Sequence, residues 1–237
     1  MTLQRDEVPP AVPSYRDGVT AGAVVAGAER RAGELLGVGT ARWHHSTGVA
    51  TAAAALARMF SEEDAELLVA AAWLHDIGYC AELLDTGFHP LDGARHLRAL
   101  GASDRLCRLV ANHTGAWAEA ASRGLADVLA GEFPAEESLL ADALTYADIT
   151  TGPLGQPLSA EERIAEILER YEAGHVVHRA IRQVTPELLA TVRRVEERMP
   201  GVPGRSGLHP RLRLCSRPPC PASLPCWRPD WMAWRGT

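Results

Sequence analysis

Adjacent histidine and aspartate residues, His75 and Asp76, place an imidazole and a carboxylate side by side, and both groups bind divalent metals. His75 follows Leu67 and Ala71 at the i, i+4 spacing of a helix, so it belongs to the apolar face of that helix. We expect Gly78 to cap this helix, which would place the pair on a last turn whose carbonyls and dipole favour a cation. The alternative is an ordinary helix end with a hydrogen-bonded histidine.

Two further polar residues interrupt apolar helical stripes in the same way. His45 shares a face with Val49, whereas the adjacent His44 does not. We therefore predict that His45 is a ligand and that His44 is either a bystander or a residue that supports a ligand without touching the metal. Asp148 continues the stripe of Leu144, and a buried carboxylate without a partner costs several kcal/mol. A cation or a strong donor is therefore expected beside Asp148, unless this aspartate turns to water at a helix end.

Two more histidines complete a candidate set. His113 closes a predicted helix on its apolar side, and His89 opens another, with Pro90 suited to the first turn. Either histidine alone would more often be structural than catalytic. Together the candidates exceed what one metal requires and would serve two metals bridged by a carboxylate. The six candidate ligands are His45, His75, Asp76, His89, His113 and Asp148.

The motifs that carry these residues resemble those of the HD-domain superfamily of metal-dependent phosphohydrolases. The resemblance is firm over residues 42–152 and implies an all-α helical bundle with metal ligands on the inner faces of several helices. The last two motifs are also similar to those of bacterial hydrolases of symmetric dinucleoside tetraphosphates. In family order, the matching segments are Arg42-Trp43-His44-His45-Ser46, Leu74-His75-Asp76-Ile77-Gly78, His89-Pro90 with Gly93-Ala94, Asn112-His113-Thr114-Gly115 and Tyr146-Ala147-Asp148.

This resemblance implies hydrolysis of a phosphate ester or anhydride of a small molecule, a nucleotide in particular. Asp76 would bridge two metals, one of them also held by His45, His75 and Asp148, and the other by the two remaining histidines. One or two ions of Fe, Mn, Mg, Zn or Ni would lower the pKa of bound water from about 16 toward 7. The resulting hydroxide would attack phosphorus in line, with Asp76 and His75 as the catalytic pair.

Arg95, about one helical turn from His89, is a candidate for binding substrate phosphate, although a surface role on its helix fits its position equally. Two other functions use the same ligand set. A di-iron oxygenase would activate oxygen with the metals, and a nucleotide-binding sensor module would turn nothing over. Ligand identity alone does not separate hydrolysis from redox chemistry.

The composition predicts one helical domain. Apolar residues make up 46% of the 237 residues and aromatic residues only 5%, and helical stripes recur where alternating β patterns are absent. Ser159 with glutamates two and three residues later is typical of a helix N-terminus. Helices are expected at about 19–37, 43–60, 64–77, 90–100, 103–113, 136–149, 159–172 and 175–198.

Three segments follow from composition: a flexible arm over 1–18, the metal-dependent domain over 19–199 and a tail over 200–237. The tail holds eight of the 16 prolines and no apolar stripe, so we expect it to be disordered; a functional tail and a terminus read from a shifted frame both stay open. Its six arginines and one aspartate give +5, which leaves −11 of the total −6 for residues 1–199. That charge opposes nucleic-acid binding and favours a small phosphorylated substrate.

We also expect a cytoplasmic protein without membrane association. The apolar run at 21–28 is too short to cross a bilayer, and the acidic, proline-bearing start over 1–13 lacks the basic segment of a signal peptide. The sequence leaves the oligomeric state open.

Overall fold

The computed structural model describes residues 22–199, and this part of the chain forms ten α-helices, short 3-10 turns and no β-strand. The predicted all-α fold is confirmed. The predicted arm over 1–18 and tail over 200–237 lie outside the described residues. In chain order the helices are α1 Ala23–Leu36, α2 Ala41–Leu56, α3 Glu62–Leu74, α4 His89–Ala99, α5 Asp104–Ala111, α6 Ala116–Ser122, α7 Ala126–Glu132, α8 Leu139–Ile149, α9 Ala160–Arg170 and α10 Val176–Glu196.

All eight helices expected from the sequence are present, with ends that shift by a few residues. Helices α6 and α7 were not expected. Each has only seven residues, which is too short for an apolar stripe to repeat, and Leu129 is the single buried residue of α7. Tertiary packing, rather than a local pattern, therefore decides that these two segments are helical.

Side-chain caps determine where the helices that carry the predicted ligands begin. The Thr40 hydroxyl accepts the Trp43 amide at the start of α2, and Ser138 caps α8 in the same way. At α9 the prediction for Ser159 is confirmed: its hydroxyl accepts the Glu162 amide, and the Glu162 carboxylate accepts the Ser159 amide. These caps satisfy backbone donors that would otherwise lack partners.

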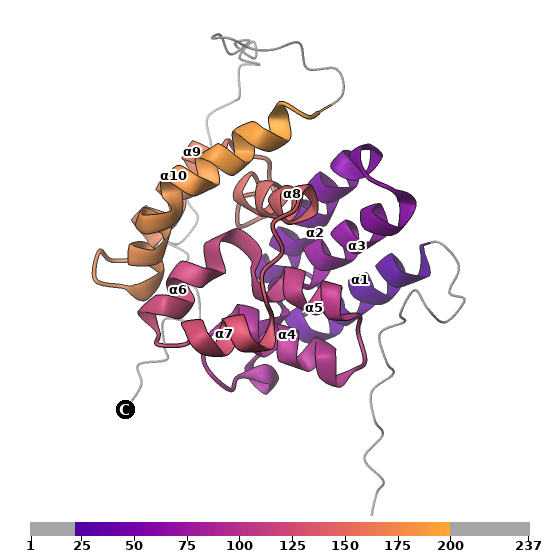
Figure 1. Cartoon of the computed structure of the whole chain (residues 1–237), viewed down its shortest axis with the longest axis horizontal. Helices are drawn as coiled ribbons and strands as arrows, with labels where there is room; N and C mark the ends of the chain where they lie inside the picture. The colour runs from indigo at the N-terminus through magenta and orange to yellow at the C-terminus, as the bar shows by residue number, and fades with distance from the viewer. Residues whose placement is uncertain (1–21, 200–237) are drawn as a thin grey trace, which may run out of the picture. The chain divides into compact units, whose positions relative to one another are not determined.

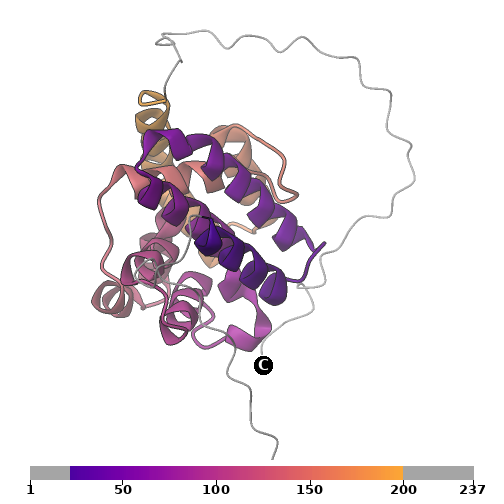
Figure 2. The same ribbon diagram turned by 90° about the vertical axis from the view of Figure 1, so that its right-hand side faces the viewer.

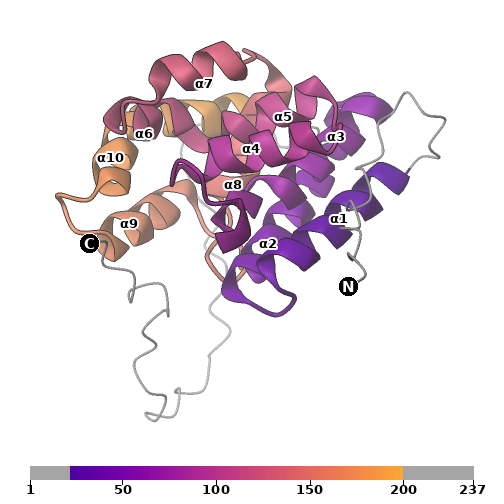
Figure 3. The same cartoon turned by 90° about the horizontal axis from the view of Figure 1, so that it is seen from below.

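Helix α8 is the central element of the described part of the chain. Helices α1, α2 and α3 pack side by side (Figure 2), and α8 lies against α2 and α3 on one side and α10 on the other (Figures 1 and 3). A larger apolar core joins α1–α5 to α8, and a smaller one joins α9 and α10 to α6 and the end of α8. Within residues 22–199, no helix has both the length and the apolar character that a membrane crossing requires.

Gly78 does not cap α3, so that prediction is wrong. Helix α3 ends at Leu74, His75 follows in right-handed helical conformation, and Gly78 lies in a 3-10 turn without the positive φ of a glycine cap. A Cβ atom at Gly78 would overlap the carbonyl of His89 and crowd the amide of Gly93. Glycine is therefore needed here because the first turn of α4 lies directly against its backbone.

Candidate metal centre

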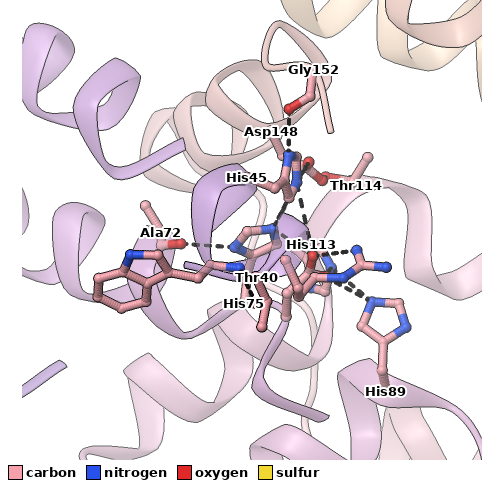
Figure 4. Close-up of polar contacts among 12 residues, drawn as sticks. Thr40, His45, Ala72, His75, His89, His113, Thr114, Asp148 and Gly152 are labelled. Atoms are coloured by element: carbon pink, nitrogen blue, oxygen red, sulfur yellow. Dashed lines mark hydrogen bonds and ion pairs between the residues drawn. The ribbon is translucent and has the colours of Figure 1, made fainter. Parts of the chain in front are cut away.

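Five elements bring the six predicted ligands to one place. His45 comes from α2, Asp148 from α8 and His75 from the end of α3, while His89 begins α4 and His113 follows α5 (Figure 4). Asp76 follows His75 directly in the chain. Five of the six residues are buried, and the His89 side chain keeps only 13% of its surface exposed. Helices that are far apart in the sequence thus converge through their polar side chains.

The first of two groups within the cluster consists of His45, His75 and Asp148. The Nε2 atom of His45 lies 3.0 Å from Asp148 Oδ1 and 3.4 Å from His75 Nε2, and the His75 nitrogen lies 3.9 Å from the same carboxylate oxygen. The three potential ligand atoms all lie within 4.8 Å of one another. Their spacing suits coordination of a single ion between them.

The second group consists of Asp76, His89 and His113. Asp76 Oδ1 lies 3.4 Å from His89 Nε2 and 4.0 Å from His113 Nε2, and the two imidazole nitrogens are 3.3 Å apart. The other oxygen, Asp76 Oδ2, faces the first group, at 3.5 Å from His75 Nε2 and 3.8 Å from His45 Nε2. Asp76 therefore stands between the two groups with one oxygen toward each, as a bridging carboxylate would.

Hydrogen bonds to backbone carbonyls orient three of the imidazoles. The Nδ1 atoms of His75 and His113 donate to the carbonyls of Ala72 and Val110 at 2.7 Å, and that of His45 donates to a third carbonyl at 3.1 Å. These contacts assign the proton to Nδ1, so the Nε2 lone pairs point at one another and at the carboxylates. Converging lone pairs beside carboxylates repel unless a cation lies between them, so the residues fit a divalent metal.

The electrostatics of the cluster hold the ligands in the protonation state that a metal needs. Burial lowers the pKa values of His75, His89 and His113, although the nearby carboxylates partly oppose it. Burial alone would raise the pKa values of Asp76 and Asp148, but Arg42 and the histidines outweigh it at Asp76, and the histidines do so at Asp148, so both pKa values lie well below the usual range. Lowered pKa values at these three histidines and at the two carboxylates favour neutral imidazole and ionised carboxylate, which are the forms that bind a divalent metal.

A family model for the HD domain matches residues 42–174, which is more than half of the chain. The chain belongs to the HD domain family. HD domains are in general metal-dependent phosphohydrolases that bind divalent cations, and the histidines and aspartates of this one could hold a metal. Searches of curated proteins and of solved structures returned no match. The narrower similarity to dinucleoside tetraphosphate hydrolases therefore stays a prediction.

Arg42 and Tyr79 flank the HD pair on its open side. The Arg42 guanidinium donates to Asp76 Oδ2 at 2.6 Å and lies over the Tyr79 ring, 3.9 Å from its centroid. The same ring stacks on His89, with centroids 3.9 Å apart. The Tyr79 ring therefore lies between His89 of the second ligand group and the Arg42 guanidinium, which pairs with the Asp76 oxygen that faces the first group. Arg42 occurs in the first motif of the sequence, but nothing in the sequence pattern assigned it a role.

Thr114 supports Asp148 from a strained backbone. Its φ of 45° makes it the one described residue other than glycine in the left-handed region, which is costly for a β-branched side chain. From there its hydroxyl donates to Asp148 Oδ2 at 2.5 Å, while Asp148 Oδ1 faces His45 (Figure 4). The strain thus directs a donor at the carboxylate oxygen turned away from His45.

Arg95 and His44 lie away from the cluster. The Arg95 guanidinium donates to Asp85 at 2.6 Å and to Glu132 at 2.5 Å, and neither it nor these carboxylates line the cavity at the metal centre. The structure therefore does not bring Arg95 to the site as the predicted phosphate ligand. His44 is exposed, whereas its neighbour His45 is 2% exposed.

The cavity beside the metal centre has a far wall that the sequence interpretation missed. Helix α9 contributes Arg163, Ile167 and Arg170, and helix α10 contributes Ile181 and apolar neighbours. The three α9 residues are spaced i, i+4, i+7 and so share one face. The same reasoning that identified His45, a polar residue on an apolar stripe, could have identified Arg163.

Proposed function

We propose that this HD domain hydrolyses a phosphate ester or anhydride of a small molecule, a nucleotide in particular, with the help of divalent metal ions. The observation that carries the proposal is the position of Asp76, with one carboxylate oxygen toward each of two ligand groups. Two cations held in this way can clamp a phosphoryl group between them, which suits in-line displacement at phosphorus. When bound, such metals lower the pKa of coordinated water toward about 7 and so supply a nucleophile at neutral pH.

The protein's own side chains would bind and orient the substrate. The Arg42 guanidinium, next to Asp76, presents donors at the place where phosphoryl oxygens would lie, and its planar fork matches their geometry. The Thr114 hydroxyl donates to the Asp148 oxygen that is turned away from His45 and so keeps this carboxylate in its orientation. With these groups in place, the reaction needs no serine or cysteine nucleophile.

The size of the cavity favours a small substrate that inserts only its phosphate end. The cavity volume is about 90 Å³, below the roughly 300–1,000 Å³ of pockets that enclose a whole drug-sized ligand. A phosphoryl group fits such a space, and the rest of a nucleotide would lie at the mouth. The net charge of −11 over residues 1–199 also favours a small substrate over a nucleic-acid chain.

The test is a screen of phosphate monoesters, diesters and nucleoside polyphosphates with the full chain, supplemented in turn with Fe, Mn, Mg, Zn or Ni. We expect phosphate release that depends on metal, and elemental analysis that gives about two ions per chain. His75→Ala and Asp76→Ala should each lose metal and abolish release. His44→Ala is the matched control, because it removes an exposed histidine next to a ligand, and it should retain both properties.

Two results would contradict the proposal. Oxygen consumption by the reduced iron form, with a visible absorption band and no phosphate release from any substrate, would instead indicate a di-iron oxygenase. Tight nucleotide binding without turnover in every metal form would indicate a sensor module. Equal metal loss in folded His44→Ala and His45→Ala proteins would overturn the ligand assignment itself.

A further inference from the structure

We propose that Arg163 and Arg170 of α9 form the anion-binding wall of the cavity and select a terminal phosphate, so that the substrate is a phosphate monoester rather than a diester. This inference rests on the proposed function and narrows its substrate class. It starts from the cavity lining, in which both arginines face the space that His45, Asp76 and His89 line from the other side.

Arg163 is the central observation. Arg163 is only 6% exposed, and the Nη1 atom of its guanidinium donates to Glu166 at 2.5 Å. The Nε atom of the same guanidinium has no hydrogen-bond partner among the described residues. A buried charged donor without a partner is costly unless a ligand completes it. Because Arg163 is one of the residues that line the cavity of the metal centre, an anion bound there would supply the missing partner.

Glu166 holds the two arginines as a pair. One of its carboxylate oxygens accepts from Arg163, and the other accepts from the Nε atom of Arg170 at 2.8 Å, so a single side chain orients both guanidinium planes. The end of α9 is in turn anchored to α10, because the His178 ring donates from Nδ1 to the Tyr171 carbonyl at 2.9 Å. The arginine pair is therefore preorganised before any ligand binds.

Charge and volume decide between a monoester and a diester. Three arginines and three carboxylates line the cavity, and Glu166, which pairs with the two α9 arginines, adds a fourth negative charge. Two bound divalent metals would outweigh this difference and leave an excess of positive charge. That excess matches the second negative charge of a terminal phosphate better than the single charge of a diester. A diester also needs room for a substituent on each side of phosphorus, which a space of about 90 Å³ does not provide.

The experiment measures the binding of inorganic phosphate by calorimetry, alongside the hydrolysis of a matched monoester and diester. The full chain is compared with Arg163→Gln and with Arg170→Gln, which changes a less buried side chain and so guards against misfolding of the first variant. Arg194→Gln is the control, because Arg194 also pairs with a carboxylate, Asp142, but lies outside this cavity. Urea unfolding verifies that each variant is folded.

We expect Arg163→Gln and Arg170→Gln to weaken phosphate binding on the order of 10- to 100-fold, as for lost hydrogen bonds between charged groups, with no change in Arg194→Gln. Equal phosphate binding in all three folded variants, or faster hydrolysis of the diester by the full chain, would overturn the inference. Arginine-dependent phosphate binding without hydrolysis of any substrate would support it while contradicting the proposed function. Metal-dependent hydrolysis that is unchanged in both Arg163→Gln and Arg170→Gln would support the proposed function and contradict this inference.

Discussion

Replacing Gly78 by alanine tests whether the backbone contact between the 3-10 turn after α3 and the first turn of α4 positions His89 in the second ligand group. The added Cβ atom would overlap the carbonyl of His89, which is backbone and cannot move aside as a flexible side chain would. Overpacking typically costs about 1–3 kcal/mol, so a clash with backbone belongs at the upper end, at about 3 kcal/mol of unfolding free energy. Because His89 must shift, the metal content should also fall from about two ions per chain toward one.

The matched control is Gly131→Ala, the same chemical change in α7 at a position where a Cβ atom meets nothing within 4 Å. Without a clash, the helix propensity of alanine should raise the unfolding free energy by about 0.5–1 kcal/mol. Urea denaturation and elemental analysis of both variants give the comparison. A cost of less than about 1 kcal/mol at Gly78 with full metal content would refute the close-approach argument.

Three further predictions concern the ligands and their supports. His89→Ala should lower the metal content from about two per chain toward one, and unchanged stoichiometry by elemental analysis would mean that His89 contacts substrate or merely packs. Thr114→Val, which removes only the donor to Asp148, should weaken metal binding about 10- to 100-fold in a calorimetric titration, whereas Thr114→Ser should keep wild-type affinity. When the free metal concentration is about 100 times the Kd of a site, removal of the metal by a chelator should lower the unfolding free energy by about 2.7 kcal/mol for that site. A urea midpoint that is the same with and without the chelator would argue against metal binding to the folded chain.

The helices and the ligand candidates could be predicted because their signals are local. A polar residue on an apolar stripe, such as His45 or Asp148, is visible within two or three turns, since the helical period decides which face it shares. The cap at Ser159 is equally local, because its partner Glu162 lies three residues away. The family resemblance then linked segments that the stripes alone could not connect, and the family match over 42–174 confirms it.

Only the tertiary structure decided how these residues are paired. His45 and Asp148 are 103 residues apart, and the division of the ligands into two groups around Asp76 depends on how α2, α4 and α8 pack against the end of α3. No periodicity specifies such a distance, because it is the result of many side-chain contacts summed over several helices.

The same dependence on packing explains the predictions that the structure did not support. Arg95 was a candidate phosphate ligand from its distance to His89 along one helix, with a surface role as the alternative, and its guanidinium pairs with Glu132 of α7, a helix that was not predicted. Gly78 resembles a helix cap in the sequence because a cap and a close backbone approach both require glycine. Sequence therefore determined which residues can bind metal, and packing between distant helices determined which arginines accompany them, because only packing sets the distance between residues far apart in the chain.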